Sequence, residues 1–496
     1  MDEWLGGLQA VMQVQPLLML GAGVLVGAFI GAIPGFTANM GIAILLPFTF
    51  AMDPLPGLML LLGLFASALY SGAIPAILIK TPGTPGAAAS ILDGYPLAKQ
   101  GKAGQALTIS LVSSAVGGIL GVILLALLVP VLATWALSFG NAEYFMLAVF
   151  ALVMIASLSE GAVLRGIMAG LFGVAVSTIG QDPIQAFLRY TFGVSNLSSG
   201  IEFVPLLVGV FGVAEALTQY EKFRERNEKP LPVGSFTLPW KAWRALAPTT
   251  WWSTLIGFTV GVAPGAGGTV ASFLAYNEAK RFTRKDRGKF GKGDPRGLAS
   301  AEASNNASIT GALAPMLTLG LPGDAATALL IGALTVHGLQ PGPGLFQANT
   351  DLVYGLFIGL VLAYVVILIA GLAATRIWGQ VLRVPRNILW PLVLVLCMLG
   401  SFSLRGNTFD VLVMAVFGVI GYLMMKANVP IIPLVVGAVI GPIAESSLRR
   451  AMIVHDGSFA WLGRPIPMVL LVLTLASLAL PVWRHFRRSD DHVTTH

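Results

Sequence analysis

Residues 245–277 read ALAPTTWWSTLIGFTVGVAPGAGGTVASFLAYN, a run of 33 residues with no charged side chain and with Pro264-Gly265 near its middle. Lys241 and Arg244 precede the run, and Lys280 follows it. One membrane span needs about 20 apolar residues, so the run is too short for two full spans. It fits two helices of about 15 residues, each about 20 Å long, in a re-entrant hairpin with Pro-Gly at its tip. Its basic flanks predict that both ends face the cytoplasm.

A second uncharged run lies between Glu3 and Asp53, and Pro34-Gly35 interrupts it. Several Gly and Pro residues of the two regions correspond at fixed shifts. Gly27, Gly31, Pro34 and Gly35 recur 230 positions later as Gly257, Gly261, Pro264 and Gly265, and Pro75, Pro82 and Gly83 recur 240 positions later as Pro315, Pro322 and Gly323. These matches predict two related repeats, with a ten-residue insertion in the basic loop Lys280–Arg296.

The two repeats are expected to be inverted. The first uncharged run has acidic residues and no basic residue at its ends, whereas the second has basic residues at both ends. Because Lys and Arg determine orientation and Asp and Glu contribute little, the first hairpin should open to the opposite side of the membrane. Its tip would then approach the second tip from across the bilayer, and one site would lie between them.

Composition indicates the class of protein. Of the 496 residues, 56% are hydrophobic and only 11% are charged, against roughly 25% charged in soluble domains. About a dozen apolar runs predict an all-α polytopic membrane protein of about a dozen transmembrane helices plus re-entrant Pro-Gly hairpins. The net charge of +7 comes from loops and the tail, a pattern typical of inner-membrane topology rather than of nucleic-acid binding. The sequence has no G-x-x-x-x-G-K-[ST] motif, so we do not expect ATP hydrolysis.

The breaks within the apolar runs are the predicted substrate site. Pro removes a backbone donor and Gly permits a reversal, so each break leaves a half-helix N-terminus whose N–H groups suit a carboxylate. Simple kinks are the alternative, which four breaks at related positions make less attractive. The expected substrate-binding residues are Pro34, Gly35, Asn39, Lys80, Thr81, Pro82, Gly83, Thr84, Pro264, Gly265, Gly267, Thr269, Pro322 and Gly323.

Three polar residues near the last break are candidates for coupling to a sodium ion or a proton: Asp324, Asn305 and Asn306. Asp324 lies in an uncharged run from Ala303 to Thr350, where an ionisable side chain is a functional candidate. It is also a suitable N-cap for a helix from Ala325 to Val336. Glu302, Asn305 and Asn306 can equally be loop caps or part of the site. No tightly bound cofactor or metal is expected, because Cys397 is the only cysteine and three of the five histidines lie in the tail.

The expected organisation is sequential. It comprises an N-terminal segment (1–14), the first transport repeat (15–135), intervening helices and a cytoplasmic loop (136–244), the second transport repeat (245–375), C-terminal helices (376–483) and a cytoplasmic tail (484–496).

Three motifs also resemble those of a known family. Residues 31–35 (GAIPG) followed by 44–47 (ILLP), residues 81–85 (TPGTP) followed by 93–99 (DGYPLAK), and residues 264–269 (PGAGGT) through 302–306 (EASNN) to 338–343 (GLQPGP) resemble the large subunit of the tripartite tricarboxylate transporters. The resemblance spans residues about 15 to 480. It implies secondary active uptake of a carboxylate, with a cation gradient, across the bacterial inner membrane.

The resemblance also implies a small membrane subunit and a periplasmic solute-binding protein as partners, and a transporter rather than an enzyme. Two alternatives stay open: a stand-alone secondary anion carrier and, with less support, an intramembrane enzyme. An enzyme needs several ionisable residues within the spans, and the sequence supplies few.

Overall fold

The structure is a computed structural model that describes residues 2–158, 163–221, 231–374 and 386–491. Helices dominate this part of the chain, and its only strands are the short antiparallel pair β1 (Gly180–Gln181) and β2 (Leu188–Arg189). The first helices are α1 (Asp2–Val11), α2 (Val14–Ala32), α3 (Ala38–Thr49), α4 (Pro54–Ser71), α5 (Ala73–Ile79), α6 (Ile91–Leu97), α7 (Ala103–Ala136), α8 (Asn141–Leu158), α9 (Val163–Ser177), α10 (Phe203–Leu207) and α11 (Ala214–Glu221). The later helices are α12 (Trp240–Val262), α13 (Gly267–Phe282), α14 (Pro295–Leu319), α15 (Ala325–Val336), α16 (Pro343–Ala348), α17 (Thr350–Ala374), α19 (Arg386–Ser403), α20 (Thr408–Lys426), α21 (Ile431–Val454) and α22 (Pro465–Asp491).

Eight helices in the described residues are long and apolar enough to cross a membrane. Five apolar helices are shorter, among them α3, α9 and α15. The chain is therefore an all-α polytopic membrane protein, with eight candidate spans where the sequence predicts about a dozen. The difference arises because several apolar runs form helices that are shorter than the bilayer core.

The first hairpin consists of α2 and α3, with its tip at residues 33–37. Ile33 leaves the helix in an extended conformation, with φ −89° and ψ 116°, and Gly35 has φ 89°, which only glycine adopts without strain. Gly27 of α2 packs so closely on α4 that a Cβ there would collide with the carbonyl oxygen of Leu64. Glycine is therefore required at the tip for its conformation and along α2 for close packing.

The second hairpin consists of α12 and α13 and repeats these features at the related positions. Ala263 has φ −78° and ψ 115°, and Gly265 has φ 85°. A Cβ on Gly257 would collide with the carbonyl oxygen of Ser304 in α14, as one on Gly27 would with that of Leu64. The predicted hairpin is present, although α12 has 23 residues rather than about 15.

The second break of each half, at Pro82-Gly83 and at Pro322-Gly323, also has matching geometry. Lys80 and Gly320, 240 positions apart, both end a helix in the left-handed conformation, with φ 57° and 69°. One residue later, the Thr81 N–H donates to the Pro75 carbonyl at 3.3 Å, and the Leu321 N–H donates to the Pro315 carbonyl at 3.2 Å. The continuations differ. A 12-residue helix, α15, follows the second break, whereas only the 3-10 turn η1 (Pro85–Ala88) directly follows the first.

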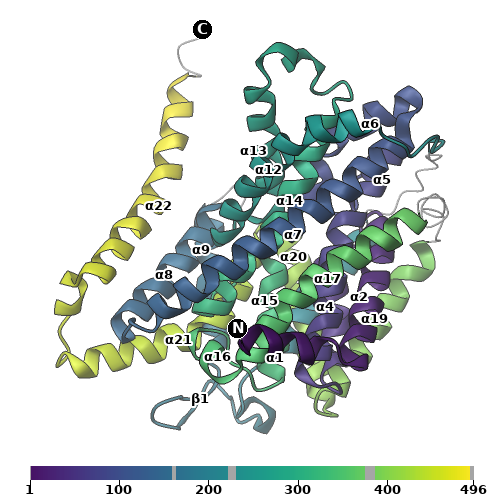
Figure 1. The fold of residues 1–496 in the computed structure, drawn as a ribbon. Helices are drawn as coiled ribbons and strands as arrows, with labels where there is room; N and C mark the ends of the chain where they lie inside the picture. The colour runs from purple at the N-terminus through teal and green to yellow at the C-terminus, as the bar shows by residue number, and fades with distance from the viewer. Residues whose placement is uncertain (1, 159–162, 222–230, 375–385, 492–496) are drawn as a thin grey trace.

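The two hairpins open at opposite ends of the helical bundle (Figure 1). At the end where α1 and α16 lie, Thr49 at the close of α3 adjoins Gly57 of α4, and Gly57 in turn faces His337. At the other end, Asp93 of α6 accepts hydrogen bonds of 2.9 and 2.8 Å from the N–H groups of Gly291 and Gly293, in the loop that follows α13. The basic loop therefore lies at the open end of the second hairpin only.

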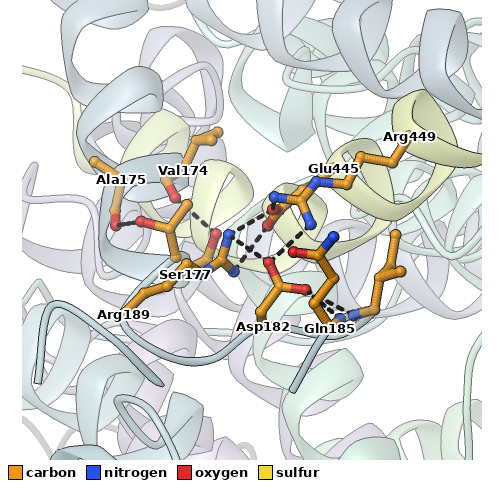
Figure 2. A network of polar contacts seen from close by, with 10 residues as sticks. Val174, Ala175, Ser177, Asp182, Gln185, Arg189, Glu445 and Arg449 are labelled. Carbon is orange, nitrogen blue, oxygen red and sulfur yellow. Dashed lines mark hydrogen bonds and ion pairs between the residues drawn. The ribbon is translucent and has the colours of Figure 1, made fainter. Parts of the chain in front are cut away.

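The β1–β2 segment is attached to the C-terminal half of α21 by ion pairs (Figure 2). Arg189 lies 3.3 Å from Asp182 and 2.6 Å from Glu445, and Arg449 lies 2.7 Å from Asp182. The carboxylate of Asp182 also accepts hydrogen bonds from backbone N–H groups of its own turn. The network thus fixes a non-helical segment at the end of the bundle where α16 lies.

At the C-terminus, α22 continues to Asp491, past residue 484 where the sequence predicts the tail to begin. The helix stands along the edge of the bundle in Figure 1. Residues 222–230, which belong to the cytoplasmic loop predicted within residues 136–244, and residues 375–385 lie outside the described part of the chain.

Candidate functional site

Three helices of at least 12 residues begin at the breaks, and they differ in how their N-termini are capped. Thr37 caps α3 by accepting a hydrogen bond from the Met40 N–H at 3.3 Å. Asp324 caps α15 in a capping box with Thr327, with two reciprocal bonds of 2.8 Å. The N-terminus of α13 has no side-chain cap. Among the described residues, the N–H groups of Gly267, Gly268 and Thr269 donate to no group outside the helix, so they are the ones available to an anion.

Asn305 of α14 faces this uncapped N-terminus. The side chain is fully buried, and neither its amide oxygen nor its amide nitrogen has a hydrogen-bond partner. A Cβ on Gly268 of α13 would collide with the amide oxygen of Asn305, and so would one on Gly86 of η1. A buried amide without partners costs about 1–3 kcal/mol, so its presence requires a reason, such as a ligand.

Thr84 is a further buried polar residue close in sequence to this group. Its hydroxyl has no partner and lies against Gly72, between α4 and α5, and the residue precedes Gly86 by two positions. Both η1 and α13 pack against α14, so the second break of the first half meets the hairpin of the second half. Together the α13 N-terminus and Asn305 present several donors and no fixed charge, which suits the oxygens of a carboxylate.

The other predicted substrate residues are distributed around this group. The N–H of Gly265 donates to the carbonyl of Gly323 at 2.7 Å, which joins the second tip, with Pro264, to the last break, with Pro322. In the first half, Gly83 packs on the carbonyl of Gly31.

The first tip has different neighbours. Gly35 faces Gln219 of α11, and Phe36 contacts Trp390 at a ring distance of 6.2 Å. Pro34 is buried, and Asn39 is half-buried in the first turn of α3. None of the described contacts brings residues 34–39 to Asn305. The first half reaches Asn305 through Gly86, which follows the break at Pro82-Gly83.

Lys80 lies outside the buried group. Its side chain is exposed, and its ammonium is 6.0 Å from the ring centroid of Tyr95, which Lys99 also approaches. Thr81 is half-buried, and its hydroxyl bonds to the Ile79 carbonyl at 3.3 Å. The prediction of a substrate-binding charge at Lys80 is not tested by these contacts, but its side chain is directed to the surface.

The coupling candidates occupy two environments. The side chain of Asp324 forms the capping box at the start of α15, which is the N-cap role that the sequence predicts for it beside ion coupling. Glu302, Asn305 and Asn306 lie within α14 and are fully buried, so they are not loop caps. The amide nitrogen of Asn306 donates to the Glu302 carbonyl at 3.2 Å, while its oxygen has no partner.

Two surface hollows lie elsewhere. One of about 620 Å³ is bounded by α12 and the basic loop, with Lys289, Lys292 and Arg296 in its wall, and one of about 490 Å³ is bounded by residues 338–345. Asn305 lines neither hollow. The buried polar groups without partners, rather than these hollows, define the candidate site, because they are the ones that a ligand would satisfy.

A helical bundle with eight candidate spans and broken helices around buried polar groups is typical of a multi-pass membrane transporter. The tripartite tricarboxylate transporter TctA family matches residues 17–436, and the chain belongs to this family. The resemblance seen in the sequence is thereby confirmed. Family membership makes the chain the large membrane subunit of a tripartite transporter and implies transport rather than an enzymatic reaction. It also implies a small membrane subunit, a periplasmic binding protein and a carboxylate solute.

Two relatives from Agrobacterium vitis are similar to the chain. An uncharacterized 52.8 kDa protein of the TAR-I region, 3′ of ttuC′, is 35% identical over 472 residues, which cover 95% of this chain and 94% of the relative. An uncharacterized protein in the corresponding TAR-II region is 33% identical over 238 residues, covering 48% of this chain and 98% of the relative. No solved structure matches the chain.

Proposed function

We propose that this chain is the membrane subunit of a secondary active, cation-coupled transporter that imports a citrate-like tricarboxylate or a related carboxylate. A periplasmic binding protein delivers the solute to the inner membrane, and the small membrane subunit completes the complex. The observation that carries the proposal is the uncapped N-terminus of α13 opposite the unpartnered amide of Asn305. This pair offers neutral donors to a carboxylate deep in the bundle.

The proposal includes two inverted repeats that enclose the site. The similar φ angles of Gly35 and Gly265, and of Lys80 and Gly320, support the duplication. The opposite directions in which the hairpins open support the inversion (Figure 1). In this arrangement the first half contributes Thr84 and Gly86, and the second contributes Asn305 and the N-terminus of α13.

The coupling ion is a proton or sodium, bound by groups that include Asp324, Asn305 and Asn306 or their neighbours. The sequence carries no nucleotide-binding motif, which favours an ion gradient over ATP as the energy source.

The test is uptake into proteoliposomes that contain both membrane subunits, with the binding protein outside and a panel of labelled di- and tricarboxylates. Proton and sodium gradients are imposed separately. We expect one carboxylate to accumulate with a cation gradient and only with the binding protein present. Accumulation without the binding protein would identify a stand-alone carrier, and a requirement for ATP would contradict the proposal.

A further inference from the structure

Glu302 lies one helical turn from Asn305 in the middle of the bundle. It is fully buried in α14. The hydroxyl of Ser90, just after η1, donates to one carboxylate oxygen, and the hydroxyl of Ser114 in α7 donates to the other at 2.9 Å. A third hydroxyl, that of Ser110, lies one helical turn before Ser114 in α7 and is buried without a hydrogen-bond partner. Hydroxyl groups therefore lie around the carboxylate of Glu302, which the sequence alone predicts to be either a loop cap or part of the site.

No cation balances this carboxylate in the part of the chain that the structure describes, since no Lys, Arg or His nitrogen forms an ion pair with it. The titratable groups within the bundle on the elements that pack against α14 are neutral or acidic: Tyr70 of α4, Asp93 and Tyr95 of α6, Tyr276 and Glu278 of α13, Asp324 at the start of α15, and Tyr364 of α17, whose hydroxyl donates to the Asn306 carbonyl. Basic residues on these elements lie at their ends, such as Lys280 and Arg281 in the last turn of α13.

A carboxylate without a countercharge in such an interior is destabilised by the loss of hydration, and it is stabilised when it takes up a proton. The serine hydroxyls accommodate both states, because each can donate to the carboxylate or accept from the carboxylic acid. A sodium ion would instead need several oxygen ligands around it, whereas in the described residues the side-chain groups hydrogen-bonded to the carboxylate are the two hydroxyls of Ser90 and Ser114. The surroundings thus favour a proton over sodium.

Glu302 is also connected to the candidate carboxylate site. Ser90 follows η1, whose Gly86 lies against Asn305, and Asn305 is three residues from Glu302 on the same helix. A movement of η1 on solute binding would displace the Ser90 hydroxyl and change the stability of the charged form of Glu302.

Building on the proposed function, we propose that Glu302 is the group that binds and releases the coupling proton during solute import. It accepts a proton while the site is open to the periplasm and returns it when the site opens to the cytoplasm. The carboxyl is restored after each cycle, so one proton crosses the membrane for each turnover of this group.

The experiment compares wild type and Glu302→Gln in proteoliposomes with the partner proteins and the carboxylate that the solute panel selects. Solute counterflow measures exchange without net proton movement, and a pH dye in the lumen measures solute-dependent acidification. Because Gln resembles the neutral acid, we expect Glu302→Gln to retain counterflow within about threefold but to lose both acidification and accumulation driven by a pH gradient. Glu302→Asp should keep acidification with a shifted pH profile.

The matched control is Glu143→Gln, the same change at a buried carboxylate that lies 3.4 Å from Arg464. It should keep both readouts. Acidification by Glu302→Gln at the wild-type rate would overturn the inference. The inference would also be overturned if acidification were lost in Asp324→Asn and not in Glu302→Gln, or if sodium alone drove accumulation by the wild type. Loss of counterflow in both Glu302 variants, when they purify as intact protein, would overturn it as well. Wild-type vesicles without any counterflow would instead contradict the proposed function.

Discussion

At the scale of single residues, Asn305 is the feature that needs most explanation, because a fully buried amide is left without partners. We expect Asn305→Leu, which keeps a similar shape, to raise the KM for the solute at least tenfold. It should leave the melting temperature unchanged or higher, because removal of an unsatisfied amide relieves about 1–3 kcal/mol of desolvation. Transport kinetics and thermal unfolding check the two effects. Exposed Asn277→Leu in α13 is the control, and a lower melting temperature with unchanged KM would identify Asn305 as purely structural.

Lys80 tests whether a fixed charge takes part in solute binding. The sequence predicts that Lys80→Asn weakens transport, whereas the side chain is exposed and near Tyr95. From the structure we expect KM to stay within about twofold. The melting temperature should rise slightly, because Asn tolerates the left-handed conformation of this residue better than Lys does. A large rise in KM at normal expression would show that Lys80 binds the solute.

At the scale of elements, the β1–β2 segment depends on Asp182 (Figure 2). Hydrogen bonds from the backbone of Gln185 and Ile184, together with Arg449, lower the pKa of Asp182 to about 2. A lowered pKa contributes stability above the unfolded value near 3.8, and this contribution is lost as the pH falls towards 2. We therefore expect Asp182→Asn to increase hydrogen exchange of residues 180–189 at neutral pH. At or below about pH 2, where the carboxyl is protonated in wild type as well, it should differ little from wild type, and an equal difference at neutral pH and at pH 2 would contradict this account.

The breaks show how far sequence predicts elements. The tips at Pro34-Gly35 and Pro264-Gly265 follow directly from Pro and Gly within uncharged runs, and both hairpins are present. The 3-10 turn after Lys80 could not be predicted, because Pro82 and Pro85 indicate a break but not the conformation of the residues beyond it. The lengths of α12 and α22 were also underestimated, since both helices extend beyond the apolar run that marks them.

The candidate site was predicted only in part. Gly267 and Thr269 lie at the start of α13, and Thr84 lies two residues before Gly86, because all three adjoin breaks that the sequence reveals. The sequence predicts Asn305 as a coupling candidate. It does not predict that Asn305 lies against Gly86 and Gly268, because that position depends on how helices from both halves pack. Glu302 carried one usable signal. It precedes Asn305 and Asn306 by three and four positions, a spacing that places all three on neighbouring faces of one helix.

At the scale of the whole molecule, the opposite directions of the hairpins predict a sided labelling pattern. Single cysteines at Leu5 and Asp53, and at Arg244 and Gly288, all replace exposed residues. In a Cys397→Ala background, an impermeant maleimide added to intact cells should label positions 5 and 53 and not 244 and 288, which should react only after lysis. The basic flanks of the second hairpin orient it to the cytoplasm. Labelling of all four positions from the same side would mean that the hairpins are not inverted.

The central claim is that a carboxylate binds at the uncapped N-terminus of α13, and solute protection of a cysteine at this position tests it most directly. Thr269→Cys, half-buried in the first turn of α13, and its neighbour Val270→Cys, which is 43% exposed, are compared in a Cys397→Ala background. Both variants are first shown to transport, and a small methanethiosulfonate reagent is then added with increasing solute. We predict that the reaction of Cys at 269 slows with half-effect near the KM, while that at 270 does not change. An unchanged rate at 269 under saturating solute, or equal protection at both positions, would contradict the account.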